Sequence, residues 1–209
     1  KRELDKSNIQ SKFIRGLRVT DEKIIDIVES VLIDFNNDIV ESLKKFGTDA
    51  VSIHTKKNNV IKVTPEAKEL GFVGIPSKID NNLIENILNK NQVPIISPLG
   101  LGNDNHPYNI NGDTAAGAIA KSLKSRRLLL MTNVEGVLDK NKKLIDEISS
   151  LEILKMIEDN TITEGMIPKI NTCLDAVNNG VTAVGIIDGR KQHSILFEIF
   201  SDKGSGTLI

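Results

Sequence analysis

The sequence predicts an α/β fold, because short apolar runs rich in β-branched residues alternate with amphipathic segments. The expected strands cover residues 50–53, 60–63, 72–73, 93–96, 128–131, 181–187 and 207–209. The expected helices cover residues 21–32, 37–46, 81–90, 114–123, 151–158, 168–180 and 194–200. The sequence contains no internal repeat and no Pro/Ser-rich linker, so the simplest expectation is one domain. Open α/β folds bind ligands in the loops at the carboxyl ends of their strands.

Polar residues and glycines set the expected helix boundaries. Thr20 precedes two acids and an apolar pattern of helical period, as an N-cap does. Asp80, Asp113 and Ser150 stand in equivalent places before later helices. Gly47 is expected to end the second helix.

Composition narrows the range of functions. The 209 residues have a formal net charge of −1, which gives no reason to expect nucleic acid or an anionic membrane as partner. Cys173 is the one cysteine, and its helical context predicts a small packed thiol. No apolar run approaches the length of a membrane span or of a signal sequence, so we expect a cytoplasmic protein. The chain starts at Lys1 in what looks like a charged helix, and we expect it to be a fragment.

The densest polar signal lies in residues 108–117 (YNINGDTAAG). In an extended segment Asn109 and Asn111 point to the same side, and their amides can bind a carboxylate or an amide. Asp113 follows at a helix N-terminus. The alternative is a helix cap with turn-forming asparagines, although capping needs only one polar group and this segment supplies three.

Two glycine-containing segments are candidates for binding a nucleotide. Gly100-Leu101-Gly102, in the loop after an apolar strand, could let backbone amides approach an anion, but an ordinary turn fits equally well. Residues 130–139 (LMTNVEGVLD) leave a strand through a glycine turn, which indicates a nucleotide contact or a plain strand-turn.

Two cations stand in unusual places. Lys169 falls in the first turn of a helix, where the helix dipole disfavours a cation unless an anion is also present. Arg18 lies in an apolar run before a helix cap, and its fork suits either a ligand carboxylate or a structural ion pair. The three histidines show no metal-ligand spacing, so no metal site is expected.

Together these segments resemble the N-acetylglutamate kinase branch of the amino-acid kinase family. The likeness covers nearly the whole chain, in family order, at residues 16–22 (GLRVTDE), 70–74 (LGFVG), 108–120, 128–140, 162–169 (ITEGMIPK) and 186–207. The resemblance implies a three-layer αβα sandwich with a mainly parallel central sheet. It also implies a largely substrate-binding part at residues 1–110 and a largely nucleotide-binding part at residues 111–209.

The resemblance further implies a reaction and the residues that perform it. Mg²⁺-ATP phosphorylates the side-chain carboxylate of N-acetyl-L-glutamate, the second step of arginine biosynthesis. Lys169 would stabilise the transferred phosphoryl group, Asp113 would organise the catalytic lysines, and Arg18, Asn109 and Asn111 would hold the substrate. The implied nucleotide-binding residues are Asn133, Val134, Glu135, Gly136, Val137, Leu138, Thr161, Ile162 and Thr163.

The resemblance has a gap, and it leaves alternatives open. Family members begin with a Lys-x-Gly-Gly strand and a His-Gly-Gly-Gly-Pro stretch, and neither occurs in these 209 residues. The C-terminal segment resembles arginine-inhibited hexameric members, with His193, Glu198 and Gly204 as candidate arginine contacts. We expect a homodimer or a homohexamer. A kinase acting on another amino acid, or an inactive nucleotide- or arginine-binding regulator, are the alternative functions.

Overall fold

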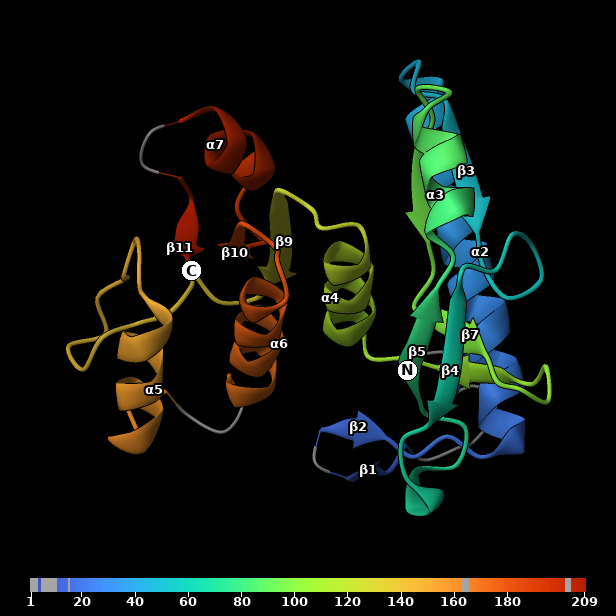
Figure 1. Cartoon of the computed structure of the whole chain (residues 1–209), viewed down its shortest axis with the longest axis horizontal. Helices are drawn as coiled ribbons and strands as arrows, with labels where there is room; N and C mark the ends of the chain where they lie inside the picture. The colour runs from blue at the N-terminus through green and yellow to red at the C-terminus, as the bar shows by residue number, and fades with distance from the viewer. Residues whose placement is uncertain (1–3, 5–10, 15, 163–165, 202–203) are drawn as a thin grey trace. The chain divides into compact units, whose positions relative to one another are not determined.

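The computed structural model describes residues 4, 11–14, 16–162, 166–201 and 204–209. It divides into two compact units, Lys1–Ala115 and Ala116–Ile209, which are described separately below (Figure 1). Strands and helices follow one another along both units, and three strand pairs among the described residues are parallel, which confirms the α/β class. No helix in the described part of the chain is long and apolar enough to cross a membrane.

The described residues of the first unit form three small sheets. A hairpin joins β1 (Phe13–Ile14) to β2 (Leu17–Arg18). β3 (Ala50–Ile53) pairs in parallel with β6 (Val93–Ile96). The third sheet has the order β5-β4-β7-β8 and consists of β4 (Ile61–Pro65), β5 (Gly74–Ile79), β7 (Leu99–Leu101) and β8 (Pro107–Asn109). A short 3₁₀ turn, η1 (Lys68–Leu70), lies between β4 and β5.

One long helix, α2 (Glu22–Lys45), replaces the two helices expected at 21–32 and 37–46. The expected break was wrong because Asn36 faces the sheet instead of ending the helix. Its side chain is 3% exposed, donates to Ile95 O at 2.7 Å, and accepts from Ser52 Oγ at 2.7 Å. These bonds satisfy a polar group that local sequence alone would place in a turn. Later in this unit comes α3 (Asn81–Leu88), capped by Asp80 as expected.

The second unit is a three-stranded sheet of order β11-β10-β9 with its helices. β9 (Arg127–Thr132) runs parallel to β10 (Ala183–Asp188), and β11 (Gly206–Leu208) pairs antiparallel with β10. α4 (Gly112–Ser122) crosses the division between the units, and α5 (Ser150–Glu158), α6 (Ile167–Asn178) and α7 (Ser194–Phe200) follow. α6 and α7 both contact β10.

The core of the second unit explains why β10 is the most buried strand. Val184, Ile186 and Ile187 have no exposed surface, and the first two pack in one cluster with Ile153 of α5 and Ile170 of α6. Cys173 is also fully buried in this cluster, as its helical context predicts. A strand buried on both faces reads as a continuous apolar run, which is the pattern of residues 181–187.

Three local expectations were wrong: one predicted loop is largely a strand, and two predicted helix caps are displaced by one residue. Gly100 and Leu101 do not lie in a loop, because Leu99–Leu101 is strand β7, whereas Gly102 begins the turn that leads to β8. A side chain at Gly100 would collide with Val63, so this glycine permits close packing of the strands. Asp21 caps α2 instead of Thr20, and Ser149 caps α5 instead of Ser150, through a capping box with Glu152.

Gly206 gives a test of the packing between β10 and β11. A Cβ at this position would lie 2.0 Å from Ile186 O, and backbone atoms cannot yield as a flexible side chain can. We expect Gly206→Ala to lower the free energy of unfolding by about 3 kcal/mol, measured by urea denaturation. Gly112→Ala, where a Cβ would meet nothing within 4 Å, is the control and should be neutral or slightly stabilising. Equal stabilities for the two variants would contradict this packing.

Candidate active site

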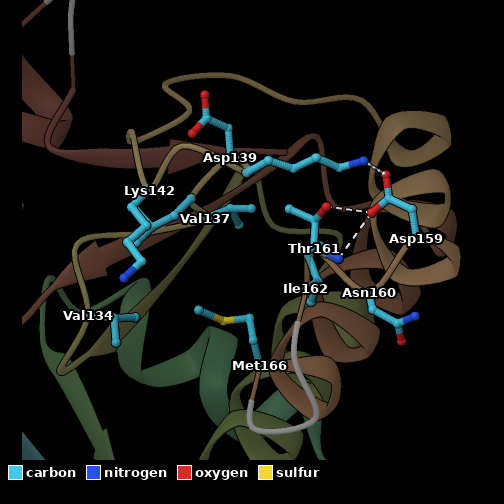
Figure 2. A pocket seen from close by; sticks show the side chains of 12 residues that line it. Val134, Val137, Asp139, Lys142, Asp159, Asn160, Thr161, Ile162 and Met166 are labelled. Atoms are coloured by element: carbon cyan, nitrogen blue, oxygen red, sulfur yellow. Dashed lines mark hydrogen bonds and ion pairs between the residues drawn. The ribbon is translucent and has the colours of Figure 1, made fainter.

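A cavity of about 680 Å³ opens in the second unit between the loop after β9 and the segment after α5 (Figure 2). Its lining residues are Val134, Gly136, Val137, Leu138, Asp139, Lys140, Lys142, Asp159, Asn160, Thr161, Ile162 and Met166. The volume lies in the usual range for small-molecule and cofactor sites. The loop leaves the carboxyl end of a parallel strand, where open α/β sheets place their ligands.

The cavity brings together two segments that lie far apart in the sequence. Val134 and residues 136–138 line it from one segment, and Thr161 and Ile162 line it from the other. All six belong to the residues for which the sequence predicts nucleotide binding. Asn133 and Glu135 are in the same loop but are not among the lining residues, and Thr163 lies outside the described residues.

The loop after β9 is held to β11 by a buried hydroxyl. Thr207 Oγ1 accepts from Val137 N at 2.8 Å and donates to Ile145 O at 2.7 Å. Gly136 adopts φ +152°, and a Cβ there would lie 2.6 Å from Thr207 Oγ1. The glycine therefore permits the close approach that fixes the loop.

The lining combines an apolar body with polar groups at its edge. Val137 and Ile162 are 2% and 4% exposed and form the buried floor, while Val134 and Met166 are more exposed and offer surface on which a flat apolar ring can pack. Asp159, Thr161 and Lys140 are joined by hydrogen bonds and an ion pair. A cavity of this kind can hold a heterocyclic base and hydrogen-bond its polar substituents.

Six lining residues were not among the predicted site residues: Asp139, Lys140, Lys142, Asp159, Asn160 and Met166. The sequence carries a weak signal for the acidic ones. Asp139 and Asp159 are each followed two residues later by a residue whose backbone N–H they accept, at 2.8 Å and 3.0 Å. This spacing is typical of turns that expose backbone groups, but nothing local indicates that the two turns meet.

Lys169 lies in the first turn of its helix, as predicted, whereas Asp113, expected just before its helix, lies inside the first turn. Lys169 follows Pro168 at the start of α6 and is partly buried. Asp113 is in the first turn of α4, but it is not the cap. Asn111 caps this helix, because its Oδ1 accepts from Asp113 N at 2.9 Å and from Thr114 N at 3.2 Å. Asn111, and not Asp113, is therefore the N-cap of α4.

A backbone ladder in the first unit links the segments that carry Arg18 and Asn109. Thr20 Oγ1 donates to Arg18 O at 3.0 Å, and Phe72 N donates to Thr20 O at 2.7 Å. Asn109 N then donates to Phe72 O at 2.9 Å. The Arg18 guanidinium donates to Ser11 Oγ and lies 4.9 Å from the centre of the Phe13 ring. Arg18 therefore has structural contacts within its own hairpin.

A second cavity in the second unit involves the candidate arginine contacts. Glu198 and Gly204 line a hollow of about 250 Å³. The other lining residues are Arg127, Asp146, Glu147, Ser201, Gly206 and Leu208. Three carboxylates against one guanidinium make this hollow acidic. His193 is exposed and is not one of its lining residues.

The carboxyl end of β10 carries a strong ion pair. Arg190 Nε and Nη2 donate to the two carboxylate oxygens of Asp188 at 2.9 Å and 2.8 Å. The Arg190 guanidinium, followed by the Arg190 backbone N–H, lowers the pKa of Asp188 to about 2. Gly189 N donates to Thr132 O at 2.7 Å, so this turn is tied to the end of β9.

The remaining titratable groups offer no metal centre. Within the described ranges, no group of three or more His, Cys, Asp or Glu side chains could hold a metal ion.

His54 is 7% exposed, and burial, followed by the nearby Lys57 ammonium, lowers its pKa.

Comparison with known proteins identifies the class that this fold and site define. The model of the amino acid kinase family matches residues 1–188, and the chain belongs to this family. The acetylglutamate kinase of Pelagibacter ubique is 56% identical over 202 residues, which are 97% of this chain and 70% of that protein. The acetylglutamate kinase of Brucella abortus is 44% identical, covering 99% of this chain and 74% of that protein. Among solved structures, smu.665 from Streptococcus mutans superposes with a TM-score of 0.85 at 31% identity, over 100% of this chain and 80% of that one.

The Asp188–Arg190 pair predicts a pH dependence of stability. Because the pKa of Asp188 is lower in the folded protein, its contribution is present above pH 4 and is lost as pH falls toward 2. Asp188→Asn should lower the urea midpoint at pH 6, and the difference from the unsubstituted chain should narrow between pH 4 and 3. Glu158→Gln, at an exposed site, is the control. A difference that stays constant with pH would contradict the pairing.

Proposed function

We propose that the chain is an acetylglutamate kinase that uses ATP to phosphorylate the side-chain carboxylate of N-acetyl-L-glutamate, in arginine biosynthesis in the cytoplasm. The main support for a nucleotide-dependent reaction is the cavity of the second unit, because residues of both predicted nucleotide-binding segments line it. We infer the identity of the phosphoryl acceptor from the relatives, since proteins 56% and 44% identical over nearly the whole chain are acetylglutamate kinases.

In this proposal the nucleotide occupies the cavity of the second unit. The adenine ring packs against Val137, Ile162 and Met166, and the polar groups of Asp159, Asn160 and Thr161 meet its amino group or the ribose. Divalent magnesium would be held mainly through the nucleotide phosphates and would neutralise their charge. Mg²⁺ is commonly held through substrate phosphates with only one or two protein carboxylates.

The proposed catalytic work is positioning and charge stabilisation, which phosphoryl transfer chiefly requires. Lys169, in the first turn of α6, stabilises negative charge on the transferred group. Asp113, whose side chain does not cap α4, orients the lysine. Arg18, Asn109 and Asn111 hold the acceptor, with Asn109 fixed by its backbone bond to Phe72. The amide nitrogen of Asn111 remains a donor because its oxygen caps the helix.

The test of this function is ATP-dependent acyl-phosphate formation, trapped with hydroxylamine. N-acetylglutamate and glutamate are compared as acceptors, with the 209-residue chain and with the same chain preceded by a Gly-rich segment carrying Lys-x-Gly-Gly. We expect product with N-acetylglutamate only, and more of it with the preceding segment. Lys169→Met should lower kcat on the order of 10²- to 10³-fold.

Lys155→Met, on the exposed surface of α5, is the matched control and should leave kcat unchanged. Product with glutamate alone would favour another amino-acid kinase. A folded protein that binds ATP or arginine without forming an acyl phosphate in either form would favour the regulator.

The acidic hollow supports a proposal for inhibition by L-arginine. The carboxylates of Asp146, Glu147 and Glu198 complement a guanidinium, and Glu198 is held in place by Ser205 N at 2.8 Å. An arginine-inhibited homohexamer would be the matching assembly, with a homodimer as the alternative.

Arginine titration with calorimetry and activity assays measures this directly. Asp146→Asn should weaken arginine binding about tenfold, because a charge-assisted hydrogen bond is lost, while ATP binding is unchanged. Glu158→Gln serves as control. Arginine that neither binds nor inhibits would remove the proposal and leave the kinase function intact.

A further inference from the structure

The two segments that line the nucleotide cavity are bridged by one ion pair. Lys140 Nζ lies 2.8 Å from Asp159 Oδ2, and both residues line the cavity. Figure 2 marks this contact together with the bonds between Asp159 and Thr161. Eighteen residues lie between Lys140 and Asp159 in the sequence, so the contact closes a long loop that includes all of α5.

Lys140 lies in a turn whose backbone is held by several hydrogen bonds. The Asp139 carboxylate accepts from Asn141 N and from Lys143 N, each at 2.8 Å. Asp139 N donates to Lys143 O at 2.8 Å, and Lys142 N donates to Asp139 O at 2.9 Å. These four bonds fix the backbone on both sides of Lys140, so its side chain starts from a defined place.

The carboxylate of Asp159, on the opposite wall of the cavity, is also held in place by hydrogen bonds. Asp159 is the C-cap of α5, and its N–H donates to Lys155 O at 3.0 Å. Its Oδ1 accepts from Thr161 N at 3.0 Å and from the Thr161 hydroxyl. The Lys140 ammonium and then the Thr161 hydroxyl lower the pKa of Asp159 to about 2, so the group is ionised at neutral pH. The same carboxylate therefore orients Thr161, a predicted nucleotide residue, and receives Lys140.

We propose that Lys140 and Asp159 are positioning residues for ATP, whose ion pair holds the loop after β9 and the segment after α5 at the spacing that the nucleotide requires. This inference rests on the proposed function, because it assigns the cavity to ATP. The pair acts on affinity and not on the chemical step, since it joins the two walls of the cavity. The side chains of Lys140 and Asp159 are 69% and 42% exposed, so we expect a modest contribution that depends on salt.

The test compares variants of the full chain by calorimetric titration with ATP. Lys140→Met should raise the Kd for ATP about two- to fivefold at low salt, as expected for the loss of an exposed ion pair. The ratio of the Kd of the Lys140→Met protein to that of the unsubstituted protein should fall toward one in about 0.5–1 M salt. Lys140→Arg should restore the affinity, because it keeps the charge. KM for ATP should rise with Lys140→Met while kcat stays within about twofold.

Two matched variants separate the pair from general effects of charge. Lys143→Met removes a neighbouring exposed lysine that does not line the cavity, and it should leave the Kd unchanged. Asp159→Asn keeps an acceptor for Thr161 but loses the charge, and in that background Lys140→Met should have no further effect.

Equal affinities of the Lys140→Met and Lys143→Met proteins, or a loss that does not respond to salt, would overturn the positioning role. The unsubstituted protein would still bind ATP in that case, so the proposed function would stand. Failure of the unsubstituted protein to bind ATP would overturn the proposed function and, with it, the role of the pair.

Discussion

The parallel pairing of β9 with β10 is the constraint on which the second unit depends. Six residue pairs, from Ala183 with Arg127 to Asp188 with Thr132, bring the carboxyl ends of both strands to the same edge. The loop that lines the large cavity and the Asp188–Arg190 turn both start there. Their proximity follows from the sheet, since parallel strands need a long crossover that returns the chain to the same end. α5 and α6 lie in this crossover and bury its apolar face.

The sequence predicts most elements because pattern and capping agree along most of the chain. It fails where a distant contact overrides the local signal. Asn36 looks like a helix end in sequence, but the sheet supplies the partners that keep α2 continuous. Gly100 looks like a binding loop, but its lack of a side chain serves the approach of β7 to Val63. Both errors are of one kind, because long-range partners cannot be read from neighbouring residues.

The residues of the candidate site also fall into those that the sequence predicts and those that only long-range contacts reveal. Val134, residues 136–138, Thr161 and Ile162 were accessible to sequence reasoning because they belong to recognisable segments. Asp159 lies outside these segments. Lys140 and Met166 lie inside them but were given no role, because only the meeting of the two segments shows that their side chains line the cavity. Arg18 shows the opposite case. Its unusual sequence position is accounted for in part by the contacts of its guanidinium with Ser11 and Phe13.

The Thr207 hydroxyl has a consequence for how this sequence can vary through evolution. The oxygen both donates to Ile145 and accepts from Val137, so it satisfies two backbone groups with one side chain that is 1% exposed. Valine has the same shape as threonine but would leave both groups without this partner, at a cost that the similar volume does not offset. Serine keeps the hydroxyl and gives up only a methyl group. The substitutions tolerated at this position are therefore ordered by hydrogen-bonding capacity before size, the reverse of the order at the aliphatic positions beside it.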